Sequence, residues 1–162
     1  MTKTRIVRAA LAHVVAACER AASYADDPPT HVLLRGKRVK LNNVATVVRF
    51  CRGMGRARTE RLVLICLDAQ DDVLDRQTVT VGELNTVRTH PREIFRPAIL
   101  AGALGIILVH NHPSGCLEPS TEDVEFTKTV KRAGELIGVR LYDHVIVAGN
   151  AGVSMRERGL LG

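Results

Sequence analysis

The sequence predicts a mixed α/β fold, in which helices pack on the faces of a β-sheet. Short apolar runs rich in β-branched residues are bounded by glycine, proline or acidic turns, which is typical of buried strands. Longer segments with helix-start and helix-stop residues alternate with these runs. The chain has 162 residues, of which 46% are hydrophobic and 25% charged, so it can bury one sizeable core.

The segment 1–40 predicts an amphipathic helix followed by a basic stretch. Apolar residues recur near helical spacing over residues 3–23, and the Asp-Asp-Pro-Pro sequence at 26–29 ends that pattern. A short strand is expected at 31–34, with the basic stretch directly after it. We therefore predict a boundary here, before a larger domain over residues 41–162.

A helix and a hairpin are predicted next. Asn43 can cap a helix that runs through about Cys51, before a glycine-containing turn. The apolar runs at 61–67 and 73–81 flank an Ala-Gln-Asp-Asp turn, and this pattern predicts a β-hairpin.

The second half of the chain predicts helices alternating with strands. A helix is expected from Pro91 to Ala101, and the apolar run at 104–109 predicts a buried strand. Strands near 140–147 and 152–155 are expected to close the domain.

Two histidines follow the strand predicted at 104–109. Its apolar run is stopped by Pro113 and Gly115. Side chains at positions i and i+2 of a strand point to the same face, so His110 and His112 are expected to project together from the end of this strand. The two imidazoles would then face one point.

A helix start follows the histidines and brings a carboxylate near them. Ser120 precedes a polar turn and a helix-like segment that extends to Ile137, with Gly138 placed as its stop, so Asp123 lies in the first turn. One carboxylate and two imidazoles supply three ligands and leave a fourth tetrahedral position for water, which is the pattern of a catalytic zinc site. The Ser-x-x-Asp spacing is also an ordinary helix-capping arrangement, and the two roles are compatible.

This spacing resembles the JAMM (MPN-type) metalloprotease motif, which places His-x-His, Ser and Asp at fixed offsets. His110, His112, Ser120 and Asp123 match every position of that motif. The wider context, over about residues 42–162, resembles the RadC-type subfamily. The segments that carry this second resemblance are 90–95, 106–115, 118–120, 141–147 and 156–160.

The resemblance implies the JAMM fold, similar in layout to cytidine deaminases, over a metalloprotease domain at residues 41–162. It implies that His110, His112 and Asp123 hold a zinc ion. It also implies hydrolysis of an amide, a peptide or isopeptide bond, in a peptide or protein substrate.

JAMM enzymes also carry an upstream glutamate, at the start of a strand, which takes a proton from the attacking water. By its position before the 61–67 strand, this residue should be Glu60. Glu83, which follows a glycine in a turn-like segment, is the rival. In the family, the serine that Ser120 matches polarises or stabilises the carbonyl oxygen of the substrate, and a hydroxyl aimed at developing negative charge is worth a few kcal/mol.

The other histidines and the cysteines are given structural roles. His144 alternates with apolar neighbours on the predicted 140–147 strand, so we interpret it as a core histidine rather than a second-sphere partner of the metal. His90 precedes Pro91 and is expected in a helix cap. Cys116 lies in the motif loop, but the ligand set is complete without it. The 4 cysteines form no Cys-x-x-Cys pair, which favours a reducing cytoplasm over a disulfide framework.

The chain carries a formal net charge of +6, and its basic residues gather at 35–40 and 52–61. These stretches can face phosphates, but no aromatic residues interleave for base stacking and no helix-turn-helix or zinc-finger spacing occurs. We expect at most weak, non-specific nucleic-acid binding. Neither a membrane-spanning run nor a signal-peptide core is seen, so we expect no membrane partner.

Three classes of function follow from these observations. The preferred one is a zinc hydrolase that acts on an amide. The alternative is a nucleic-acid-associated protein, in keeping with the DNA-repair label of RadC-type proteins, whose zinc site serves phosphodiester chemistry or structure. A zinc deaminase is disfavoured, because the His-x-Glu and later Pro-Cys-x-x-Cys signature is missing.

Overall fold

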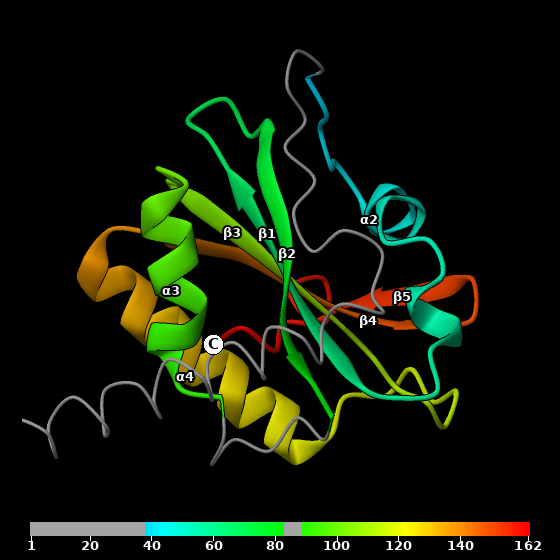
Figure 1. Cartoon of the computed structure of the whole chain (residues 1–162). Coiled ribbons are helices and arrows are strands. Elements are labelled where there is room, and N and C mark those ends of the chain that lie inside the picture. The colour runs from blue at the N-terminus through cyan, green and yellow to red at the C-terminus, as the bar shows by residue number, and fades with distance from the viewer. Residues whose placement is uncertain (1–37, 83–88) are drawn as a thin grey trace, which may run out of the picture. The chain divides into compact units, whose positions relative to one another are not determined.

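A computed structural model describes residues 38–82 and 89–162, which form the mixed α/β fold that the sequence predicts (Figure 1). The predicted helix at 3–23 and strand at 31–34 lie outside the described residues, so the boundary at residue 40 stays a prediction. The elements are, in order, α2 (Val44–Phe50), the 3-10 helix η1 (Met54–Arg56), β1 (Arg61–Leu67), β2 (Val73–Val81), α3 (Pro91–Leu100), β3 (Gly105–Asn111), α4 (Thr121–Ile137), β4 (Arg140–Ala148) and β5 (Ala151–Ser154).

The strands form one five-stranded sheet in the order β2-β1-β3-β4-β5. The strand β1 is antiparallel to both β2 and β3, which confirms the predicted hairpin. The strands β3 and β4 are parallel, and α4 makes the crossover connection that parallel strands require. The strand that carries the histidines therefore lies at the centre of the sheet.

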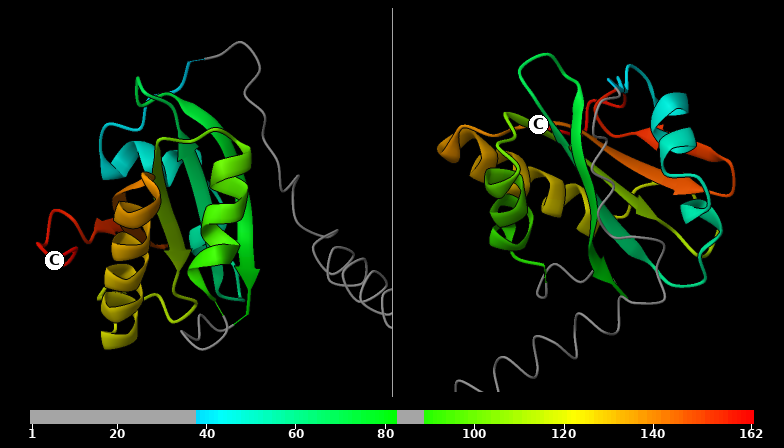
Figure 2. Two further views of the ribbon diagram at one scale, coloured as in Figure 1. Left: turned by 90° about the vertical axis from the view of Figure 1, so that its left-hand side faces the viewer. Right: turned by 45° about the horizontal axis from the view of Figure 1, so that its top comes forward.

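Side chains alternate between the two faces of the central strands, and helices cover both faces. One core contains side chains of β1 and β3 packed with those of α3 and α4, including Leu62, Leu108 and Phe126. The other contains Val63 and the opposite side chains of the same strands, packed with α2 and η1. Figure 2 shows α3 and α4 on one side of the sheet and α2 beside β5.

The helix ends follow the local signals of the sequence. Asn43 caps α2 with a reciprocal capping box, and His90 caps α3 with its ring nitrogen, as predicted. Gly138 ends α4 in the left-handed conformation with φ 76°. Within the described ranges, no helix is both long enough and apolar enough to cross a bilayer.

Candidate metal centre

Four side chains with metal-binding chemistry converge at one end of the sheet. His110 lies on β3, His112 follows that strand, Asp123 is in the first turn of α4, and Glu60 directly precedes β1. Their ligand atoms all lie within 4.8 Å of one another. His110 and Asp123 are buried, whereas Glu60 and His112 are half-buried, so the group is accessible from one side.

The register of the sheet explains why Glu60 reaches the histidines. Leu62 of β1 pairs with His110 of β3, so the antiparallel strands bring Glu60 opposite His112. The backbone carbonyl of Glu60 accepts a hydrogen bond of 2.9 Å from the N–H of Gly82, which holds the start of β1.

The ligand atoms have a spacing that suits zinc. The Nε2 atoms of His110 and His112 are 2.8 Å apart. Asp123 places Oδ1 3.2 Å from Nε2 of His110 and Oδ2 3.4 Å from Nε2 of His112. Ligands at about 2.0–2.1 Å from a tetrahedral zinc lie roughly 3.3 Å from one another. The donor set and its spacing therefore fit a zinc ion with only small adjustments.

A chain of buried hydrogen bonds fixes the tautomer of His110. The hydroxyl of Thr127 donates to the carbonyl of Asp123 at 2.6 Å, so its oxygen accepts from Nδ1 of His144, also at 2.6 Å. Burial holds the pKa of His144 well below its ordinary value, so this ring is neutral. The unprotonated Nε2 of His144 then accepts a hydrogen bond from Nδ1 of His110 at 2.8 Å. Because the proton of neutral His110 is on Nδ1, its Nε2 carries a lone pair that can bind a metal.

His112 is oriented in the same way by the motif loop. Its Nδ1 lies 3.0 Å from the carbonyl oxygen of Cys116, which can only accept a hydrogen bond. Nε2 of His112 therefore also carries a lone pair, which faces the Nε2 atom of His110. Two lone pairs at this separation repel each other unless a cation or a proton lies between them, so the arrangement favours a bound metal.

Asp123 is prepared as an anionic ligand. Burial raises the pKa of its carboxyl, but in the metal-free protein a proton on His110, in the place that a metal ion would take, and the hydrogen bonds from Ser120 outweigh this, so the pKa lies well below its ordinary value. The backbone N–H and the hydroxyl of Ser120 both donate to Oδ2, at 2.8 Å and 2.7 Å. The carboxylate is therefore ionised at neutral pH.

A family model described as a RadC-like JAB domain matches residues 41–160. This chain belongs to the RadC-like JAB domain family. Family membership and the Glu/His/His/Asp group together fit a metal-dependent hydrolase.

Several bacterial proteins named UPF0758 protein are similar to this JAB domain. The protein from Thermotoga maritima is 45% identical over 122 residues, which are 75% of this chain and 55% of that protein. The one from Chlorobaculum tepidum is 40% identical over 128 residues, or 78% of this chain and 58% of that protein. The one from Rubrobacter xylanophilus is 47% identical over 102 residues, or 63% and 44%. The chain thus spans about half the length of the curated relatives it matches.

Asn111, between the two histidines, holds the segment that carries the glutamate of this JAB domain. It is fully buried and faces the opposite side of the sheet from His110. Its Oδ1 accepts from the N–H of Arg61 at 2.9 Å, and its Nδ2 donates to the carbonyls of Ala57 and Thr59 at 3.3 Å and 3.2 Å. These bonds anchor the chain on both sides of Glu60. This role was not predicted from the sequence, although a polar residue at the end of an apolar strand is a usable signal.

His144 is a buried, hydrogen-bonded histidine, as we predicted, but its partner is His110, a candidate metal ligand. If His110 binds a metal, His144 therefore also has the second-sphere position that we had disfavoured. Thr127, which completes this chain of hydrogen bonds, was not identified from the sequence.

The remaining predicted residues are in ordinary structural positions where the structure describes them. Ser120 has the capping role that we expected, because its Oγ accepts from the N–H of Asp123 at 3.0 Å. Cys116 is exposed, and its thiol accepts from the N–H of Glu118 at 3.4 Å, so its carbonyl rather than its sulfur serves the site. Glu83, the rival glutamate, lies outside the described residues.

Removing the buried support of His110 is expected to weaken metal binding. We expect zinc affinity to fall by about 10-fold to 100-fold in His144→Phe, and by a smaller factor in Thr127→Val, because neither variant can fix the tautomer of His110. A competitive titration with a chromogenic chelator measures this change.

Thr129→Val is the matched control, since Thr129 makes the same hydroxyl-to-carbonyl bond on α4 but faces solvent. This variant should bind zinc as the parent protein does. Unchanged affinity in both Thr127→Val and His144→Phe would show that the hydrogen bonds to His144 do not support the ligand.

Proposed function

We propose that this domain is a zinc-dependent hydrolase that cleaves amide bonds, peptide or isopeptide, in peptide or protein substrates. The observation that carries the proposal is the convergence of two bare imidazole nitrogens and an ionised carboxylate beside a half-buried glutamate. Two nitrogens and one oxygen suit zinc, and three protein ligands leave a position open for chemistry. When bound, a zinc ion supplies Lewis acidity and lowers the pKa of water towards 7.

Glu60 is the proposed general base. It is half-buried and lies opposite His112 across the strand pair. Asn111 anchors the backbone next to it through a hydrogen bond with the N–H of Arg61. Its carboxylate accepts a proton from the attacking water, and it returns that proton to the amine that leaves when the amide bond breaks. This role requires an ionised carboxylate near the ligands but no bond from Glu60 to the metal.

Ser120 is proposed to assist at the carbonyl oxygen of the substrate. Its hydroxyl hydrogen is directed at Oδ2 of Asp123, and the backbone N–H of the same serine donates to that oxygen as well. The hydroxyl can therefore turn towards developing negative charge without leaving Asp123 unpaired. Such a donor is worth about 3 kcal/mol of transition-state stabilisation.

The reaction class is tested by comparing substrates. Zinc-loaded full-length chain is assayed against a mixed fluorogenic peptide library, lysine isopeptide substrates and bis(p-nitrophenyl) phosphate. Cleavage of amide substrates alone supports the proposal. Cleavage of the phosphodiester alone would instead support the alternative, a nucleic-acid-associated protein that uses the zinc site on phosphodiesters.

Nucleic-acid binding of the whole chain is expected to be weak and independent of sequence. The chain has a formal net charge of +6, and phosphate neutralisation by such charge fades as salt rises. Titration of labelled duplex and single-stranded DNA at about 50 mM and about 200 mM salt measures this. Nanomolar affinity that survives the higher salt concentration would contradict the expectation and favour the alternative function.

We propose a reducing compartment, the cytoplasm, for this protein. Cys51, Cys66 and Cys116 are free thiols, and burial raises the pKa of Cys66 to about 12, so that this thiol stays protonated.

A further inference from the structure

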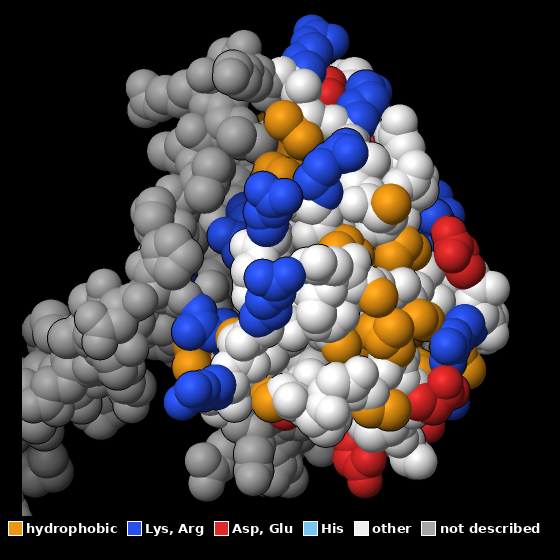
Figure 3. Space-filling model, turned by 90° about the vertical axis from the view of Figure 1, so that its right-hand side faces the viewer, with side chains coloured by type: hydrophobic (Ala, Val, Ile, Leu, Met, Phe, Trp, Pro, Cys, Tyr) orange, Lys and Arg blue, Asp and Glu red, His pale blue; other side chains and the backbone are white. Residues whose placement is uncertain are grey.

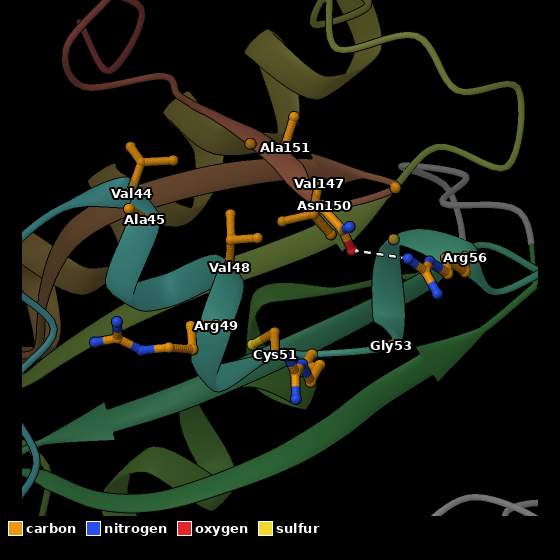
Figure 4. A pocket seen from close by; sticks show the side chains of 14 residues that line it. Val44, Ala45, Val48, Arg49, Cys51, Gly53, Arg56, Val147, Asn150 and Ala151 are labelled. Carbon is orange, nitrogen blue, oxygen red and sulfur yellow. Dashed lines mark hydrogen bonds between the residues drawn. The ribbon is translucent and has the colours of Figure 1, made fainter.

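A cleft of about 700 Å³ lies between α2, η1 and the turn that joins β4 to β5 (Figure 4). We call it the arginine cleft, because Arg49, Arg52 and Arg56 are among the residues that line it. None of its lining residues belongs to the metal centre. Its volume is in the range of sites that bind small molecules.

Close backbone packing gives the arginine cleft fixed walls. The N–H of Gly149 donates to the carbonyl of Gly55 at 2.7 Å, which joins η1 to the β4–β5 turn. A Cβ on Gly55 would lie 2.5 Å from the carbonyl oxygen of Gly149, and one on Gly152 would lie 2.5 Å from Cγ2 of Val48. A larger residue at either position would push these segments apart. The walls of the cleft are therefore closely packed.

The described residues give the cleft a positive, unbalanced charge. No acidic residue is among the described residues that line it, and its three arginines are exposed. Arg56 donates to Oδ1 of Asn150 at 3.3 Å, a neutral partner, whereas Arg49 and Arg52 form no ion pair with any residue that the structure describes (Figure 4). Figure 3 shows this face, with a column of Lys and Arg side chains beside hydrophobic ones. An anionic ligand would neutralise this group of guanidinium ions.

We propose that the arginine cleft binds the phosphate groups of a nucleotide, either free or at the end of a nucleic-acid strand. Guanidinium groups offer paired N–H donors that match phosphate oxygens in geometry and charge. The side chains of Val44, Val48 and Val147 supply an apolar surface for the sugar and base. The site is independent of the proposed hydrolysis, since it shares no residue with the metal centre.

Titrations of the full-length chain test this proposal. Adenosine diphosphate, inorganic phosphate, a short oligothymidylate and hexaglutamate are added separately at about 50 mM salt, and binding is followed by calorimetry and by amide chemical shifts. The nucleotide and the oligonucleotide are expected to bind more tightly than inorganic phosphate, with shifts at Val44, Val48 and Gly149. Tighter binding of the oligonucleotide than of the nucleotide would assign the ligand to nucleic acid, and the reverse would assign it to a free nucleotide.

Matched variants separate a built site from diffuse charge. Arg49→Gln with Arg52→Gln should weaken nucleotide binding at least about tenfold, because two charged hydrogen-bonding partners are lost. Arg96→Gln with Arg132→Gln removes the same charge elsewhere and should change affinity by less than about twofold. Arg49→Lys with Arg52→Lys keeps the charge and should still weaken binding, since the paired donors are gone.

Each contrary outcome is clear. Equal losses of nucleotide affinity in the Arg49→Gln, Arg52→Gln variant and in its control would show that diffuse charge binds the nucleotide, and this would overturn the proposal. Preferred binding of hexaglutamate would assign the cleft to an acidic peptide instead. Dissociation constants above about 1 mM for every phosphate probe would also overturn the proposal, because binding this weak is not that of a specific site. Zinc content should be equal in all variants, so a failure here leaves the proposed hydrolase untouched.

Discussion

Replacing Glu60 with glutamine is expected to leave zinc bound and to abolish hydrolysis of any substrate that the parent protein cleaves. Glutamine has nearly the same shape as glutamate, so the anchoring of this segment by Asn111 is preserved. It cannot accept a proton from water, and the loss of a general base slows turnover by about 10²-fold to 10⁴-fold. Zinc content and turnover are measured on the same preparation.

Glu122→Gln is the matched control for this prediction. Glu122 is an exposed carboxylate in the first turn of α4, adjacent to Asp123 in sequence, and it lies outside the ligand group. Its replacement should leave both zinc content and turnover at the parent level. Full turnover by the Glu60→Gln variant would show that Glu60 is misassigned, and Glu83 would become the candidate base.

His112→Ala is expected to lose both the zinc ion and the activity. His112 supplies one of the proposed ligands, and its removal leaves only His110 and Asp123 of that set. The site should then hold zinc too weakly to retain it through dialysis. Because His112 is half-buried and follows the end of β3, the fold should tolerate the change.

The control for this variant is His90→Ala, which removes a histidine from the exposed cap of α3. It should keep its zinc and its turnover, with at most a loss of stability of about 1 kcal/mol from the missing cap. Retention of a full complement of zinc by the His112→Ala variant would remove His112 from the ligand set. Circular dichroism of both variants shows whether the fold is intact.

Most elements of the described fold were predictable, because their signals are local. The apolar runs of β1 and β3, and the cap residues Asn43 and Ser120, determine where strands and helices begin without reference to distant segments. Spacing along the chain also placed His110 and His112 on one face, as the geometry of their Nε2 atoms confirms.

The support of the metal centre was harder to predict, because it depends on pairing between distant segments. His144 meets His110 only because β4 lies parallel to β3 in a register that pairs His144 with Leu108. Asn111 anchors the start of β1 because those two strands are neighbours, although 50 residues separate it from Arg61 in sequence. Local hydrophobic patterns predict neither the order of the strands in the sheet nor the register in which they pair.

The arginine cleft illustrates the same limit. The basic stretch at 52–61 was evident from the sequence, and so were the glycines near the end of β4. That these two segments lie side by side could not be predicted, because it depends on the packing of η1 against the β4–β5 turn, through the hydrogen bond between Gly55 and Gly149. The charged run therefore allowed a phosphate-facing surface, besides an ordinary solvated basic face, but it could not predict a cleft with defined walls.

The zinc content of protein purified without chelator and supplemented with zinc tests the central claim most directly. Elemental analysis should find about one zinc ion per chain, because the ligand atoms of His110, His112 and Asp123 have the number and chemistry of a structured zinc site. Less than about half a zinc ion per chain after supplementation would contradict the account, since a preformed site of this kind fills when metal is supplied.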